Sequence, residues 1–122
     1  MENPLVSIIM NCHNGERFLR EAIDSVYAQT YSNWEIIFWD NVSTDDSSSI
    51  AQSYDNRLRY YLSEGFTSLG MARELAVQKS NGEYVAFLDC DDFWHHSKLS
   101  MQIPLFFRHE DVGVVYSNYW IV

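Results

Sequence analysis

The chain has 122 residues, of which 8 are basic and 17 acidic, and its formal net charge is −9. This length is that of one domain or of part of a larger one, and the negative charge argues against binding along a nucleic-acid backbone, which needs Lys and Arg. Apolar residues make up 47% of the chain and charged residues 20%, a composition that excludes a disordered protein.

The first predicted elements alternate between strand and helix. A continuous apolar run over 5–10 predicts a strand covered on both faces. Apolar residues at helical spacing over 16–29 predict an amphipathic helix, for which Asn14 is the expected N-cap. The apolar run 34–39 predicts a second strand, and a short helix is expected through Ile50 and Tyr54.

The second half continues the alternation. We expect a strand over 58–62, a helix around 71–76, a strand over 84–88, a helical segment over 97–108 that Pro104 kinks or interrupts, and a fifth strand over 112–116. This order predicts an α/β fold, a doubly wound and mostly parallel sheet with helices on both faces. Ligands of such sheets bind outside the carboxyl ends of the strands.

Polar clusters follow three of the predicted strands, at 11–15, 40–46 and 89–92. In the last cluster, Asp89, Asp91 and Asp92 repel one another, and a divalent cation would relieve this repulsion. Their hard oxygen ligands select Mg²⁺, Mn²⁺ or Ca²⁺ over zinc. The alternative is that they are solvated loop acids or caps of the next helix. The spacing of an EF-hand is absent.

Two further side chains are candidates for ligand contacts. Asp40 ends its strand, where it can accept a hydrogen bond from a ring N–H or a ribose hydroxyl. Arg73 lies near the start of a helix, where a cation is unfavourable, so its partner is either an acidic neighbour or a ligand phosphate. The cluster 11–15 lacks the glycine pattern of a Rossmann dinucleotide site and the Gly-Lys-Ser/Thr of a P-loop.

The chain resembles the family 2 glycosyltransferases, inverting enzymes of the Rossmann-like GT-A fold that use nucleotide-diphosphate sugars. The matching stretches are 4–9 with Asn14, 28–37, 40–45, 72–73 and 81–92, followed by Trp94, 98–99 and Gln102. Asn41 and Val42 depart from the acidic residue and the glycine that are usual in the family.

The resemblance implies a donor site. Asp40 would pair with the base, typically uracil, and the loop from Cys12 to Glu16 would line the base and ribose pocket. Asp89 and Asp91 would form the Asp-x-Asp motif that holds Mn²⁺ or Mg²⁺ against the diphosphate. The implied nucleotide-binding set is Cys12, His13, Asn14, Glu16, Asp40, Ser43, Arg73 and Asp89, and the metal ligands are Asp91 and Asp89.

The resemblance also implies a reaction: transfer of a sugar from a donor, typically UDP-linked, to an acceptor hydroxyl with inversion, as in polysaccharide biosynthesis. The acceptor would be a saccharide or a lipid-linked molecule. The site that binds it and the general base are expected beyond Val122. We therefore predict that 1–122 is one domain, the nucleotide-binding half of a truncated transferase with little activity alone. Apolar residues over 114–121 lead us to expect a homodimer.

Two other functions stay open. A nucleotidyltransferase of the same fold would carry a Gly-rich, Arg-containing loop after the first strand, which this chain lacks. A non-catalytic nucleotide- or sugar-binding module would keep the pocket without the chemistry.

The compartment is inferred from two absences and the cysteines. The N-terminus has no signal peptide, and no apolar run approaches the ~20 residues that span a bilayer. The chain has only two cysteines, Cys12 and Cys90, which suits a reducing compartment, and although their location at strand ends makes proximity possible, we expect no disulfide between them. We predict a cytoplasmic protein, with the inner face of the membrane as the alternative location of a full-length form.

Overall fold

A computed structural model of the chain describes residues 3–108, and the side chains of residues 3–106. Its centre is a four-stranded sheet in the order β3-β2-β1-β4, in which every neighbouring pair is parallel. The strands are β1 (Val6–Cys12), β2 (Trp34–Asp40), β3 (Leu58–Leu62) and β4 (Tyr84–Phe87). Cys12 pairs in register with Asp40, so β1 and β2 end together.

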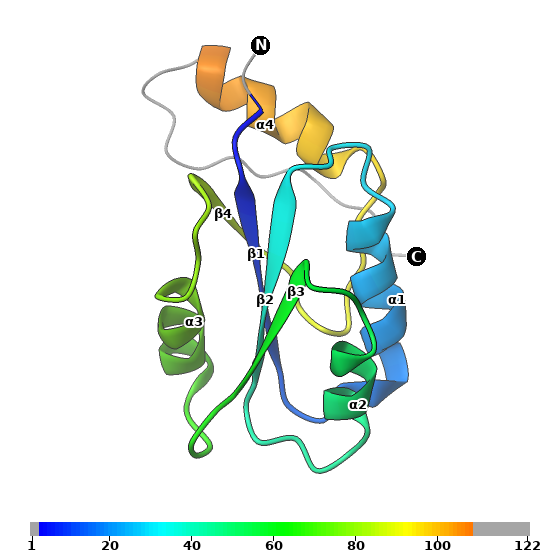
Figure 1. The fold of residues 1–122 in the computed structure, drawn as a ribbon, viewed down its shortest axis with the longest axis vertical. Helices are drawn as coiled ribbons and strands as arrows, with labels where there is room; N and C mark the ends of the chain where they lie inside the picture. The colour runs from blue at the N-terminus through cyan, green and yellow to red at the C-terminus, as the bar shows by residue number, and fades with distance from the viewer. Residues whose placement is uncertain (1–2, 109–122) are drawn as a thin grey trace.

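Helices cover both faces of this sheet (Figure 1). They are α1 (Glu16–Tyr27), α2 (Ser47–Gln52), α3 (Leu69–Val77) and α4 (Lys98–Arg108). α1 and α2 lie on one face and α3 on the other, while α4 crosses near the starts of β1 and β2. The predicted α/β architecture is thereby confirmed. No helix among residues 3–108 has the length and apolar character required to cross a bilayer.

Two apolar cores hold the layers together. The larger one joins the sheet to α1, α2 and α4 through fully buried side chains such as Phe38 and Ile23, and the smaller one joins it to α3 through Trp39 and Ala72. Phe38 and Trp39 are neighbours in β2 and therefore face opposite sides. Burial on both faces explains why the two central strands, β1 and β2, are nearly continuous apolar runs in the sequence.

A partly buried polar network ties the amino ends of the strands to the turn before β4. Ser7 Oγ donates to Glu35 Oε2 over 2.6 Å, the Asn81 N–H donates to the same oxygen over 2.8 Å, and Arg59 pairs with Oε1 at 2.8 Å. The Gly82 N–H in turn donates to Ser7 Oγ over 2.8 Å. Burial alone would raise the pKa of Glu35, but the hydrogen bonds from Ser7 and Asn81 and the charge of Arg59 lower it below its usual value.

Three local expectations have different outcomes. The helix does not end at Pro104, because α4 continues to Arg108. Asn14 is not the N-cap of α1, and that prediction was wrong: the cap position is Gly15, which has no side-chain cap bond. The strand expected at 112–116 and the apolar surface expected over 114–121 lie outside the described residues, so the predicted homodimer is untested.

Candidate functional site

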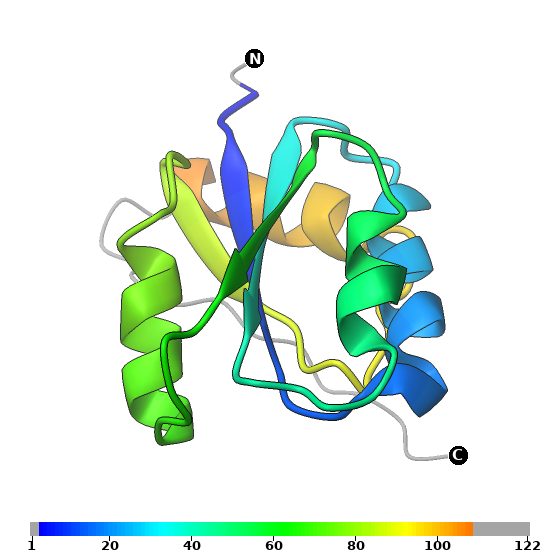
Figure 2. The same cartoon turned by 60° about the horizontal axis from the view of Figure 1, so that its bottom comes forward.

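The loops that follow β1 and β2 are bonded to each other side by side (Figure 2). The Asn14 N–H donates to Ser43 Oγ over 2.9 Å, and Asn14 Oδ1 accepts from the Thr44 N–H over 2.7 Å. Glu16 Oε2 accepts from the Asp46 N–H over 3.1 Å. Asn14 makes its two bonds to the second loop with a backbone φ of 53°, a left-handed value that asparagine tolerates. The two loops therefore form one continuous rim at the carboxyl end of the sheet.

Three residues assigned above to nucleotide binding take part in these bonds. Asn14 Oδ1, Glu16 Oε2 and Ser43 Oγ each accept from a backbone N–H of the facing loop, so in this structure the three side chains hold the two loops together. Their contact with a nucleotide stays a prediction.

Asp40 is buried beneath this rim, with 1% of its surface exposed. Oδ1 accepts from the Ser43 N–H over 2.8 Å, and Oδ2 accepts from the Tyr60 hydroxyl over 2.5 Å. Burial, followed by this bond to the Asp40 carboxylate, raises the pKa of Tyr60 to about 12. Both carboxylate oxygens already have protein partners, so a ligand N–H must share or replace one of them. The predicted pairing of Asp40 with a base is neither established nor contradicted by this geometry.

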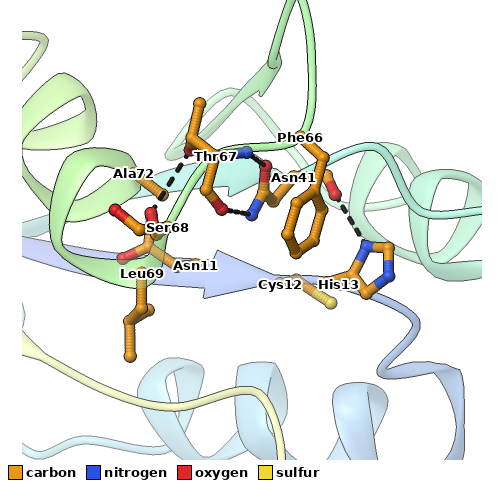
Figure 3. A pocket seen from close by; sticks show the side chains of 9 residues that line it. All are labelled: Asn11, Cys12, His13, Asn41, Phe66, Thr67, Ser68, Leu69 and Ala72. Carbon is orange, nitrogen blue, oxygen red and sulfur yellow. Dashed lines mark hydrogen bonds between the residues drawn. The ribbon is translucent and has the colours of Figure 1, made fainter.

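A cavity of about 220 Å³ opens at the carboxyl ends of β1 and β2, on the side of α3 (Figure 3). The Asn41 side chain bridges to the loop before α3, donating to the Thr67 carbonyl over 2.8 Å and accepting from the Thr67 N–H over 3.0 Å. The cavity is lined by Asn11, Cys12, His13, Asn41, Phe66, Thr67, Ser68, Leu69 and Ala72.

The walls of this cavity include the phenyl ring of Phe66, the imidazole of His13 and the side-chain amide of Asn11. His13 Nδ1 lies 2.7 Å from the Asn41 carbonyl oxygen and therefore donates to it. Its ring meets that of Phe66 edge to face, with centroids 4.9 Å apart. Asn11 Nδ2 is buried without a hydrogen-bond partner among the described residues. Such a donor is costly unless a ligand or a water satisfies it.

The acidic cluster lies beside this cavity, in the loop after β4. Asp89, Asp91 and Asp92 are exposed, and each offers a carboxylate oxygen within 4.8 Å of the others. Partial burial, then the charges of Asp91 and Asp89, raise the pKa of Asp92. Arg73, which follows the cavity residue Ala72 in α3, approaches Asp89 with Nη2–Oδ1 at 3.4 Å. The closely spaced oxygens fit a hard divalent cation, and the partner of Arg73 in this structure is the acidic neighbour.

The two cysteines meet at the same end of the sheet. Cys12 is buried at the end of β1, Cys90 is half-buried between Asp89 and Asp91, and both are free thiols. A Cβ added at Gly15 would lie 2.6 Å from Cys90 Sγ and 2.9 Å from Cys12 Sγ, so both sulfurs pack against this glycine. The two neighbouring thiols shift each other's pKa in opposite directions, lowering the pKa of Cys12 against the effect of burial and raising that of Cys90.

The structure thus places the assigned residues in three groups. Cys12 and His13 line the cavity, and Arg73, Asp89 and Asp91 stand next to it. The carboxylate of Asp40 lies on the other face of the sheet, where it bonds to Tyr60.

Sequence reasoning missed the cavity residues Asn11, Asn41, Phe66 and Thr67 as site residues. Asn11 opens the polar cluster 11–15, which was a usable signal. Phe66 and Thr67 lie in a loop without any periodic pattern.

The chain is similar in sequence and fold to several known proteins. The family model described as Glycosyl transferase family 2 matches residues 7–122. Two curated Escherichia coli relatives are UDP-Glc:alpha-D-GlcNAc-diphosphoundecaprenol beta-1,3-glucosyltransferases. WfgD is 36% identical over 123 residues, covering 100% of this chain and 48% of the relative, and WfaP is 39% identical over 118 residues, covering 96% and 47%. This chain therefore spans about half the length of these relatives.

A solved structure matches as well. TarS 1–349 of S. aureus in complex with UDP-GlcNAc superimposes with a TM-score of 0.81 at 26% identity, over 86% of this chain and 32% of that one.

Proposed function

Because the chain belongs to glycosyl transferase family 2, we propose that it supplies the donor site of a glycosyltransferase that uses a UDP-linked sugar. The observation that carries this proposal is the cavity at the carboxyl ends of β1 and β2, which contains an unsatisfied amide and adjoins three clustered carboxylates. The relatives whose names specify UDP-Glc, and the neighbour that binds UDP-GlcNAc, support uridine as the nucleoside.

In this proposal the base enters the cavity. The Asn11 amide donates to a carbonyl oxygen of the base, which would satisfy a donor that now has no partner among the described residues. The edge-to-face pair of His13 and Phe66 forms an aromatic wall. The expected contact of Asp40 with the base is not part of this arrangement, because the Asp40 carboxylate lies on the other face of the sheet, bonded to the Tyr60 hydroxyl and the Ser43 N–H.

The diphosphate lies toward the acidic cluster. A chain with a net charge of −9 repels an anionic donor, so Asp89 and Asp91 would bind Mn²⁺ or Mg²⁺ between protein and phosphate. When bound, such a cation stabilises the negative charge of the departing nucleotide diphosphate as a Lewis acid. The Arg73 guanidinium, 3.4 Å from Asp89, is near enough to this loop to contact a phosphate oxygen instead.

The transfer itself is proposed as an inverting displacement. A hydroxyl of a saccharide or lipid-linked acceptor attacks the anomeric carbon, and a carboxylate beyond Val122 takes its proton. Residues 1–122 then bind and orient the donor while the remaining steps use groups outside them.

Titration calorimetry with UDP tests the donor site directly. We expect UDP to bind the chain in Mn²⁺ and to bind much more weakly in EDTA, with GDP as the control for the base. Asp91→Asn should reduce the Mn²⁺-dependent part. Glu83→Gln, an exposed acid in the turn before β4 at the other end of the sheet, should not. Equal binding of UDP in Mn²⁺ and in EDTA would refute the proposed metal role.

Activity separates the remaining alternatives. Full-length protein that transfers labelled glucose or N-acetylglucosamine from UDP supports the transferase. Release of pyrophosphate from UTP and a sugar 1-phosphate would identify a nucleotidyltransferase instead. Binding without either reaction would indicate a non-catalytic module.

A further inference from the structure

We propose that Cys12 and Cys90 form a reversible disulfide that links the end of β1 to the acidic loop and weakens donor binding. The two residues are 78 positions apart in the chain, yet both sulfurs pack against the same glycine, Gly15. Neither thiol is needed for the proposed chemistry, because hard cations prefer oxygen ligands to sulfur.

Gly15 is what allows the two sulfurs to approach. A Cβ at this position would lie 2.6 Å from Cys90 Sγ and 2.9 Å from Cys12 Sγ, closer than real Cβ contacts come. The absence of a side chain therefore leaves room in which both sulfurs fit. Gly15 is itself fixed, since its N–H donates to Ser47 Oγ over 2.9 Å.

The difference in burial sets the order of the chemistry. Cys90 is half-buried and can meet a small oxidant, whereas Cys12 has 2% of its surface exposed. With a low-molecular-weight disulfide as oxidant, the accessible Cys90 thiol first loses its proton, a step that its raised pKa slows; the thiolate then attacks one sulfur, forms a mixed disulfide and expels one thiolate. Cys12 then attacks Cys90 Sγ, forms the protein disulfide and expels the second thiolate. The two thiol protons end on the two released thiols, so the oxidant is reduced by the two electrons that the protein loses.

The bond would change the position of the carboxylates. Two free sulfurs must close to about 2.05 Å to form a disulfide, and Cys90 is bonded directly to Asp89 and Asp91. Closing the bond would therefore move the backbone of this loop and shift the carboxylate oxygens, which lie within 4.8 Å of one another in the reduced form. This step rests on the proposed function, whereas formation of the disulfide does not.

The experiment has two independent readouts on the 122-residue chain. The first is intact mass after equilibration with reduced and oxidised glutathione. We expect the native chain to lose two hydrogen atoms without retaining glutathione, at a ratio at which the chain in urea stays reduced. A chain that stops at one glutathione adduct, or that forms the disulfide no more readily than in urea, would overturn the inference.

The second readout is calorimetry of UDP with Mn²⁺ on the reduced and oxidised chain. We expect oxidation to weaken UDP binding by about tenfold or more, corresponding to about 1.4 kcal/mol, and dithiothreitol to restore it. Cys90→Ser, which cannot form the bond, should bind UDP like the reduced chain under both conditions. A disulfide that forms without changing UDP affinity would refute the effect on the donor site. If the reduced chain binds no UDP, the proposed function fails, while the mass measurement still decides whether the disulfide site exists.

Discussion

Replacing Gly82 by alanine should destabilise the protein far more than an ordinary glycine substitution. The added Cβ would lie 2.6 Å from both the backbone N and the Oγ of Ser7, and 2.8 Å from the carbonyl oxygen of Leu5. Two of these three atoms belong to the backbone of β1 or the residue before it, so they cannot turn away as a side chain can. The turn before β4 must therefore move out.

The magnitude follows from the hydrogen bonds that this movement breaks. The Gly82 N–H donates to Ser7 Oγ, and the N–H of Glu83 donates to the Leu5 carbonyl, each over 2.8 Å. The Asn81 N–H donates to the Glu35 carboxylate over 2.8 Å. At about 1 kcal/mol for each neutral bond and about 1.5–3 for the bond to a charge, the loss is about 3.5–5 kcal/mol. That is a large fraction of the about 5–15 kcal/mol that stabilises a typical domain.

Urea unfolding monitored by circular dichroism gives the free energy of unfolding for this variant. Gly70→Ala is the matched control, because a Cβ there meets nothing within 4 Å and the position is helical. It should be neutral or stabilising by up to about 1 kcal/mol. Ser7→Ala combined with Gly82→Ala should not restore stability, since the backbone clash remains. A Gly82→Ala variant within about 1 kcal/mol of the wild type would refute the reasoning.

Three further predictions concern Glu35, Val42 and Asp91. Glu35→Gln should lower the free energy of unfolding at neutral pH. Because the pKa of Glu35 is lowered in the folded state, the Glu35 carboxylate contributes stability above the unfolded pKa of about 4.3. This contribution is lost as the pH falls through the folded pKa. Urea unfolding across this pH range should therefore show the difference in free energy of unfolding between Glu35→Gln and the wild type become smaller. Val42→Asn should raise the free energy of unfolding by up to about 1 kcal/mol, because a β-branched residue at φ 57° is strained and asparagine tolerates this region; a loss of stability would contradict the strain. Asp91→Asn should weaken Mn²⁺-dependent UDP binding by about tenfold or more in calorimetry, while unchanged binding would remove Asp91 from the metal site.

The centre of the sheet was predictable because β1 and β2 are buried on both faces. Continuous apolar runs such as 5–10 and 34–39 mark such strands without ambiguity. The same property hides which face each side chain takes, since no polar residue alternates with the apolar ones. The sequence therefore places Asp40 at a strand end, but it does not reveal that the carboxylate is buried against Tyr60.

The rest of the site depends on contacts between distant loops. Asn14 looks like a helix cap by position, yet its side chain bonds to Thr44, 30 residues away. The cavity wall at Thr67 exists because Asn41, 26 residues earlier, holds that loop in place. Local propensity carries no information on such pairings, so the parts of the site that could be found in advance were polar residues that directly follow strand ends, namely Cys12, His13 and the acidic cluster.

The paired bonds between Asn41 and the Thr67 backbone have a consequence for the departure of this chain from its family. A carboxamide imitates a peptide group, donating and accepting at once, which a carboxylate cannot do because it only accepts. An acid in place of Asn41 would put a carboxylate oxygen opposite the Thr67 carbonyl oxygen. The two acceptors would repel each other, and the loop that contains Thr67 would move away. Since the Asn41 amide carries no charge, its two hydrogen bonds to the Thr67 backbone should be equally stable in dilute buffer and in concentrated salt. Replacing Asn41 by the acid that is usual in the family would therefore detach the Thr67 loop from the cavity and leave the rest of the cavity lining unchanged.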